Sequence, residues 1–293
     1  MKKNLYFFLC FFFINGVLTS LEWPLNNFSF SMLFGDVYSK QGAFQTGLIL
    51  RGDESVKVSE YGKKLIVIEE NKNLRSFPST LGNAIVVSHK KGLQTIYAGL
   101  KNLPTITDAN SSVETFSIIG TLGDSAWGGE HELTFQVIDT QEKSFINPTR
   151  HLLSLLPFND VTPPLISGTV LVSEKTKETY KLDNIKSLKQ GEYHLYTFTK
   201  DSIVDLSESF MPFEIVAFIN GKTALDVQLY VLESNKGQLY LKKTKTSAEK
   251  LYNNEGKIYL GKVSLKRGHS EISISATDIS QNTTRVVYTL QVE

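Results

Sequence analysis

The side chains able to act as nucleophiles or metal ligands are thinly spread along this chain of 293 residues. Three of its five histidines, His151, His194 and His269, stand in segments without the spacing of metal ligands, so we expect them on the surface or in loops. Residues 123–125, Gly-Asp-Ser, come nearest to the Gly-x-Ser-x-Gly elbow of serine hydrolases, but the glycines around them predict a turn. A serine nucleophile is therefore not expected.

Residues 1–20 have the composition of an export signal. Lys2 and Lys3 precede an apolar run that ends at small polar residues, and we expect cleavage near Ser20. The run is shorter than the ~20 residues that a membrane span requires, which argues against a membrane anchor. Cys10, the only cysteine, lies inside this run, too early for a lipoprotein site, so the mature chain would have no disulfide, thiol nucleophile or thiolate ligand.

The charge balance argues against a nucleic-acid-binding protein. The chain has 31 lysines and arginines against 30 acidic residues, and removal of residues 1–20 takes away two lysines, which leaves 29 against 30. Nucleic-acid binding requires an excess of basic residues to contact phosphates. We therefore expect no nucleic-acid partner. Together with the signal at residues 1–20, we expect an exported protein, periplasmic or associated with the cell envelope, with no membrane-spanning segment after cleavage.

Strand-like patterns fill the mature chain. Residues 81–100 predict a hairpin, with an apolar run at 84–89, a turn at 90–92 and renewed alternation from 93. Residues 56–68 predict a second hairpin that turns at Tyr61 and Gly62, and 131–139 predict one more strand. Because strong helical periodicity is absent, we expect an all-β fold.

The pattern also predicts two domains, at residues 21–160 and 161–293, joined by a Pro-containing linker at 161–164. Seven or eight short strand-like runs in the second domain predict an immunoglobulin-like β-sandwich. Residues 278–282, Asp-Ile-Ser-Gln-Asn, resemble the end of many bacterial immunoglobulin-like repeats. The predicted strands lie at 165–172, 192–199, 213–219, 226–233, 238–243, 257–265, 271–278 and 286–292.

Several short pieces of residues 23–156 are informative through their order and spacing rather than singly. They are Phe34-Gly35, Phe44, Gly62-Lys63, Gly82-Asn83, Val86-Val87-Ser88-His89, Gly92, Thr95-Ile96-Tyr97-Ala98, Leu100, Ile119-Gly120, Gly123, Leu133, Phe135 and Val137. In these pieces the segment resembles the M23 (LytM or lysostaphin-type) zinc metallopeptidases, which cut peptide cross-links in peptidoglycan. The resemblance implies an M23-type β-sheet domain with a substrate groove.

All five metal-binding and catalytic positions of the family are changed. The zinc-binding motif His-x-Gly-x-Asp aligns with residues 45–49, so Gln45 and Ile49 stand at the two ligand positions. The motif His-x-His-Phe aligns with 132–135, where Glu132 replaces the catalytic base and Thr134 replaces the third ligand. The transition-state histidine of Tyr-x-His-Leu corresponds to Gly99.

These changes remove the donors that a catalytic zinc requires. Such a site needs three ligands drawn from His, Asp, Glu and Cys, and an open position for water. His131 lies one residue before the first position of the His-x-His motif. Because side chains alternate along a strand, we expect it to point away from the groove. His89 matches a histidine outside the family's metal shell, and we expect a structural or solvent-facing role. We expect no metal and no other cofactor; a site rebuilt from His89, Glu130, His131 and Glu132 is the alternative.

The resemblance therefore implies an exported, non-catalytic protein that binds peptidoglycan or regulates a cell-wall hydrolase. Tyr97, Gln45, Glu132 and Thr134 are expected to line the former groove and to offer hydrogen bonds to a peptide. Two alternatives remain at this stage. One is an active zinc metalloendopeptidase with an unconventional site, and the other is a structural envelope protein whose two β-domains are scaffolds.

Overall fold

The structure is a computed structural model of the chain. It describes residues 21–293 except 39–42, 53–54, 70–78, 104–110, 127–128, 130, 152–155, 157–158, 204–208 and 254. The predicted signal peptide and Glu130 lie outside the described residues. In the described part, no helix has both the length and the apolar character needed to cross a membrane.

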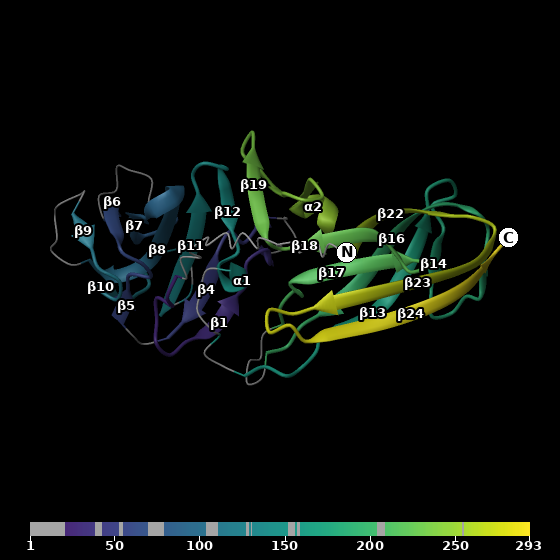
Figure 1. Cartoon of the computed structure of the whole chain (residues 1–293), viewed down its shortest axis with the longest axis horizontal. Coiled ribbons are helices and arrows are strands. Elements are labelled where there is room, and N and C mark those ends of the chain that lie inside the picture. Colours follow the sequence, from purple (N-terminus) through teal and green to yellow (C-terminus); the bar gives the residue numbers. More distant parts are fainter. Residues whose placement is uncertain are drawn as a thin grey trace, which may run out of the picture.

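The chain is all-β, as predicted, and its largest sheet has 13 strands (Figure 1). The central part has the order β12-β11-β8-β7-β6-β9. Strand β4 also pairs with β11, through Glu132–Phe135, whereas β12 pairs with the later residues of β11. Alternating apolar residues bury one face of these strands. The strands from the first half are β1 (Ser29–Met32), β4 (Leu48–Arg51), β5 (Ser55–Lys57), β6 (Gly62–Ile68), β7 (Asn83–Ser88), β8 (Leu93–Asn102), β9 (Ser112–Val113), β10 (Ile118–Leu122), β11 (Glu132–Asp139) and β12 (Ser144–Ile146).

The predicted hairpin at residues 81–100 is confirmed. Strands β7 and β8 are antiparallel, and a short 3-10 turn, η1 (Lys90–Gly92), joins them. Lys91 and Gly92 both have positive φ, 59° and 77°, which explains why a glycine closes this turn. The strand predicted at 131–139 is also present, as β11.

The hairpin predicted at 56–68 is wrong. Strand β5 pairs with β10, whereas β6 pairs with β7 and β9. Both segments have the strand pattern, but alternation does not determine which strand lies beside which. A small separate hairpin near the N-terminus consists of β2 (Val37–Tyr38) and β3 (Ala43–Phe44).

The second half forms a β-sandwich of a four-stranded and a five-stranded sheet (Figure 1). Side chains cross between the sheets, for example Tyr288, whose hydroxyl lies 3.0 Å from Thr169 Oγ1. One sheet has the order β14-β13-β16-β22 and the other β15-β24-β23-β17-β18. The strands are β13 (Leu165–Ser173), β14 (Thr179–Lys181), β15 (Ser187–Leu188), β16 (Gly191–Lys200), β17 (Glu214–Ile219), β18 (Lys222–Gln228), β22 (Ile258–Leu265), β23 (Gly268–Thr277) and β24 (Thr283–Val292).

Residues 231–247 do not join the sandwich, and this corrects two of the predicted sandwich strands. Strands β19 (Val231–Asn235), β20 (Gln238–Leu241) and β21 (Thr246–Ser247) extend the first sheet, because β19 pairs with β12. The short helices α1 (Pro148–His151) and α2 (Ala248–Leu251) lie near this junction (Figure 1). One continuous cluster of buried apolar side chains runs through both halves, so the chain folds as two closely joined parts.

Candidate functional site

A row of five side chains crosses the first sheet on the face opposite its main core. In the antiparallel ladders, Ile49 of β4 pairs with Thr134 of β11, and Thr134 pairs with Ala98 of β8. The row continues through Ala84 of β7 to Ile68 of β6. Directly opposed residues in a ladder point to the same face. The register therefore places Ile49 and Thr134, two of the predicted former metal positions, side by side.

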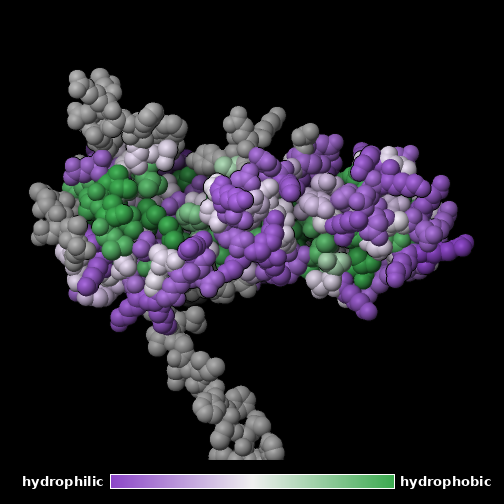
Figure 2. Space-filling view, turned by 90° about the horizontal axis from the view of Figure 1, so that it is seen from above, coloured by the Kyte–Doolittle hydropathy of each residue, from purple (hydrophilic) through white to green (hydrophobic). Residues whose placement is uncertain are grey.

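A second row runs parallel to the first and makes this face apolar. Ile66, Val86, Ile96 and Gln136 oppose one another on β6, β7, β8 and β11. Val86 and Ile96 form a separate hydrophobic cluster with Ala84 and Ala98 of the first row. We call these two rows the apolar face. Figure 2 shows hydrophobic residues gathered over the end of the molecule that holds β6, β7 and β8, and Ile66 is 52% exposed.

Gly99 occupies a backbone position that excludes any side chain. Its φ is +87°, a conformation that L-residues rarely adopt. A Cβ at Gly99 would lie 2.6 Å from the carbonyl oxygen of Glu132. Gly99 also donates its N–H to Leu81 and accepts a hydrogen bond from the N–H of Gly123. A histidine would therefore require a different local backbone.

Glu132 is buried, 8% exposed, and its carboxylate is fully engaged. Oε1 accepts hydrogen bonds from Ser31 Oγ and Arg51 Nη2, both at 2.7 Å, and Oε2 accepts one from the Gly129 N–H at 2.7 Å. Burial by itself raises the pKa of Glu132, but these three hydrogen bonds and the charge of Arg51 outweigh burial and lower the pKa below its ordinary value. A carboxylate held in its charged form by three donors is a structural anchor rather than a poised base.

Gln45 is also buried, at 7% exposure, in the segment that precedes β4. Its backbone N–H donates to Asp36, and its carbonyl accepts from Gly35. The neighbouring residue, Thr46, contacts the apolar face directly, since its Oγ1 accepts a hydrogen bond from Gln136 Nε2 at 2.6 Å. Thr46 and Gln136 are thus polar residues of this face that the sequence did not single out.

The prediction that Tyr97 lines the groove is wrong. Tyr97 is 0% exposed and packs against Phe135 in the main core, with ring centroids 5.4 Å apart. Its hydroxyl accepts a hydrogen bond from the Ser59 N–H at 2.8 Å and lies 3.1 Å from Thr95 Oγ1. Because side chains alternate along β8, Ala98 takes the groove side and Tyr97 the core side.

The two histidines near the motifs have different positions. His89 is buried, and its ring nitrogens lie 2.8 Å from Thr95 Oγ1 and 3.1 Å from the Tyr61 carbonyl, on the core side of the sheet. This agrees with the structural role expected for it. His131 is exposed, immediately before β11, with a φ of +58°. Among the described residues, neither histidine belongs to a group of side chains spaced to share a metal ion.

The polar side chains of the apolar face offer hydrogen bonds rather than charges. Those described are the Thr46 and Thr134 hydroxyls and the Gln136 amide, which donate and accept hydrogen bonds but do not ionise near neutral pH. The carboxylate of Glu132, two residues from Thr134 on β11, is paired with Arg51. These side chains can recognise a polypeptide, but among the described residues of this face no set of donors suits zinc.

Several solved structures are similar to part of this chain. A chain of the SpoIIQ–SpoIIIAH pore-forming complex matches with 19% identity and a TM-score of 0.37, covering 46% of this chain and 92% of that chain. The catalytic domain of the M23 protein EnpA from Enterococcus faecalis matches with 15% identity and a TM-score of 0.36, covering 44% and 95%. The catalytic domain of lysostaphin from Staphylococcus simulans matches with 20% identity and a TM-score of 0.32, covering 39% and 81%.

Sequence comparison gives a nearer relative. An uncharacterized protein of Treponema pallidum (strain Nichols) is 35% identical over 129 residues, a match that covers 41% of this chain and 87% of that protein. The chain belongs to the same family as this protein. A family model without a functional description matches residues 163–293. Membership of this family does not by itself assign an activity.

Proposed function

We propose that this chain is an exported, non-catalytic M23-like protein whose apolar face binds a partner protein of the cell envelope. The observation that supports this proposal most strongly is the Ile49–Thr134 pair. The residues aligned with two zinc ligands are direct neighbours in the sheet, close enough for two ligands of one ion, yet neither side chain suits the metal. This supports an M23-like sheet in which the residues at these two positions, Ile49 and Thr134, cannot bind zinc.

The chemistry of the face favours a protein over the peptidoglycan as the ligand. Exposed apolar surface is typical of protein–protein contacts. On this face Ile66 is half exposed and Ile68, Thr134 and Gln136 are partly exposed, whereas Ile49, Ala84, Val86, Ile96 and Ala98 are buried. Peptidoglycan stem peptides and glycans, by contrast, offer mainly polar and charged groups. Within the two classes of partner that the sequence suggests, we therefore favour a cell-wall hydrolase that this chain regulates.

A binding experiment with two matched variants tests the proposal. The mature chain is immobilised and presented with purified envelope hydrolases and, separately, with purified sacculi. Ile66→Glu places a charge on the apolar face and is expected to lower hydrolase binding at least tenfold. Val287→Glu changes an equally exposed residue, also 52%, on β24 of the sandwich and should leave binding unchanged.

Three outcomes would contradict the proposal. Binding to sacculi alone would identify peptidoglycan as the ligand. Absence of binding to hydrolases and sacculi would remove the binding function. Equal loss of binding in both variants would show that the apolar face is not the contact surface.

A further inference from the structure

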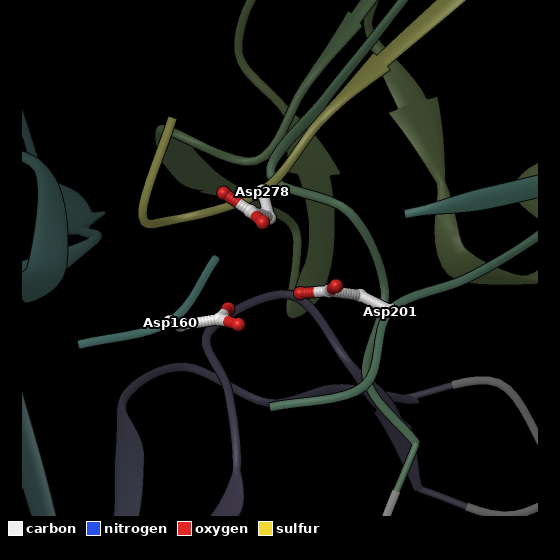
Figure 3. A group of neighbouring side chains, drawn as sticks. All are labelled: Asp160, Asp201 and Asp278. Carbon is white, nitrogen blue, oxygen red and sulfur yellow. The ribbon is translucent and has the colours of Figure 1, made fainter. Parts of the chain in front are cut away.

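Three buried aspartates meet where the two halves of the chain join. Asp160 precedes β13, Asp201 follows β16, and Asp278 follows β23. Their exposed fractions are 5%, 0% and 0%, and a carboxylate oxygen of each lies within 4.8 Å of the other two. Figure 3 shows the three carboxylates turned toward one another from three separate segments.

Neighbouring groups hold Asp278 in place. Its Oδ1 accepts a hydrogen bond from the Asn282 N–H at 2.8 Å, and its Oδ2 accepts one from Asn282 Nδ2 at 2.9 Å. The same amide nitrogen donates to the Asp160 carbonyl at 2.9 Å. Asn282 therefore fixes two of the three acidic segments relative to each other.

The other two carboxylates each keep one oxygen without a partner. Asp160 Oδ1 accepts a hydrogen bond from the Thr162 N–H and Asp201 Oδ1 from the Ser202 N–H. Asp160 Oδ2 and Asp201 Oδ2 are buried and have no hydrogen-bond partner among the described residues. A buried carboxylate oxygen without a donor is costly, and a bound cation is one way to remove that cost.

The cluster also has no described counter-charge. The described ion pairs include no lysine, arginine or histidine paired with any of the three aspartates. The negative charge of the cluster is thus not balanced by a described side chain.

We propose that Asp160, Asp201 and Asp278 bind a calcium ion. Calcium takes six to eight oxygen ligands at roughly 2.3–2.6 Å, so ligands on opposite sides of the ion are about 4.6–5.2 Å apart, which accommodates these three carboxylates. The cluster contains no nitrogen or sulfur donor, which disfavours zinc. Ser280 Oγ, two residues after Asp278, is also buried without a described partner and is a candidate further oxygen ligand.

The position of the site gives the ion a structural role. Residue 160 lies in the segment that connects the first sheet to the sandwich, whereas Asp201 and Asp278 belong to the two sheets of the sandwich. A bound ion joins all three segments through metal–oxygen bonds. We therefore expect calcium to stabilise the chain as a whole and to order the connection between its two parts.

Calorimetry on the whole mature chain, stripped of metal with a chelator, tests the site. Titration with calcium chloride should give one site per chain, and 1 mM calcium should raise Tm by about 5 °C for a Kd of about 10 μM. Magnesium at the same concentration should give a smaller shift, because it demands a more regular octahedral shell. Equal or larger shifts with magnesium would overturn the choice of calcium.

Variants separate metal binding from general folding effects. Asp201→Asn should abolish the calcium-dependent shift while the metal-free chain keeps or gains stability, since the repulsion is reduced. Asp183→Asn changes an exposed aspartate of the sandwich and should keep the full calcium response. A wild-type chain that is folded but shows neither heat of binding nor a Tm shift with calcium would overturn the proposal. A response retained in Asp201→Asn would overturn it as well.

Discussion

Ile49 of β4 lies directly opposite Thr134 of β11, in the central ladder of the first sheet. Two residues before Thr134 on β11, Glu132 opposes Arg51, and the Glu132 carbonyl faces the Cα of Gly99. Four of the five positions aligned with the M23 reaction centre therefore lie on neighbouring strands. Their side chains are a branched alkane, a hydroxyl, an engaged carboxylate and a hydrogen atom, and none is the residue type that the M23 motifs place there.

Gly99→Ala should destabilise the fold strongly. The added methyl group meets the Glu132 carbonyl and requires a positive φ, so we expect a loss of about 2–4 kcal/mol in the free energy of unfolding. Gly221→Ala is the matched control, because Gly221 also has a positive φ, +75°, but open space around it. Urea unfolding should show a loss at least about 1 kcal/mol larger for Gly99→Ala. Equal losses would mean that steric contact at Gly99 is unimportant.

Glu132→Gln should destabilise the chain in a pH-dependent way. The folded state lowers the pKa of Glu132, so its contribution is present above the unfolded pKa and disappears as the pH falls through the folded pKa. We expect a loss of about 1–2 kcal/mol at pH 7 that shrinks as the pH falls below the unfolded pKa of a glutamate and through the lower folded pKa. Urea unfolding at pH 7, 5 and 3.5 measures this, with the exposed Glu249→Gln as control. A loss that stays constant with pH would contradict a charged Glu132.

Tyr97→Phe tests the placement of Tyr97 in the core. Removal of the hydroxyl leaves the buried Ser59 N–H and Thr95 Oγ1 without this partner, so we expect a loss of about 1–3 kcal/mol. Tyr240→Phe removes an exposed hydroxyl and should cost almost nothing. Partner binding should be unchanged in both variants. Weaker partner binding by Tyr97→Phe without a loss of stability would show that Tyr97 contacts the partner and would contradict its placement in the core.

The two halves of the chain should unfold together. Strand β19 pairs with β12, and the buried side chain of Asn147 donates from Nδ2 to the Leu229 carbonyl across the junction. These contacts predict a single calorimetric transition for the mature chain. Asn147→Ala should lower Tm and broaden or split this transition. Two separate transitions in the wild type would contradict the coupling.

Strand type and the central hairpin were predictable from the sequence because they depend on local patterns. Alternating apolar residues predicted β11, and the Lys-Lys-Gly turn predicted the β7–β8 connection. Strand partners were not predictable in the same way. Residues 231–247 have ordinary strand alternation, but β12, the partner of β19, lies about 85 residues earlier in the chain. No local pattern predicts that pairing.

The site shows the same limit. The motif spacing led to Ile49 and Thr134, whose register agrees with the expectation. Strict alternation along β8 already predicts that Tyr97 and Ala98 point to opposite faces. The aspartate cluster could not be predicted in this way, since Asp160, Asp201 and Asp278 are far apart in sequence and meet only through tertiary packing.

We propose that this M23-like sheet does not support zinc-dependent cleavage, and peptide release from purified sacculi tests this most directly. The mature chain is incubated with sacculi and excess zinc, beside an active M23 enzyme and a sample with chelator. We predict no soluble peptide above the chelator control. Zinc-dependent, chelator-sensitive release by this chain would contradict the account.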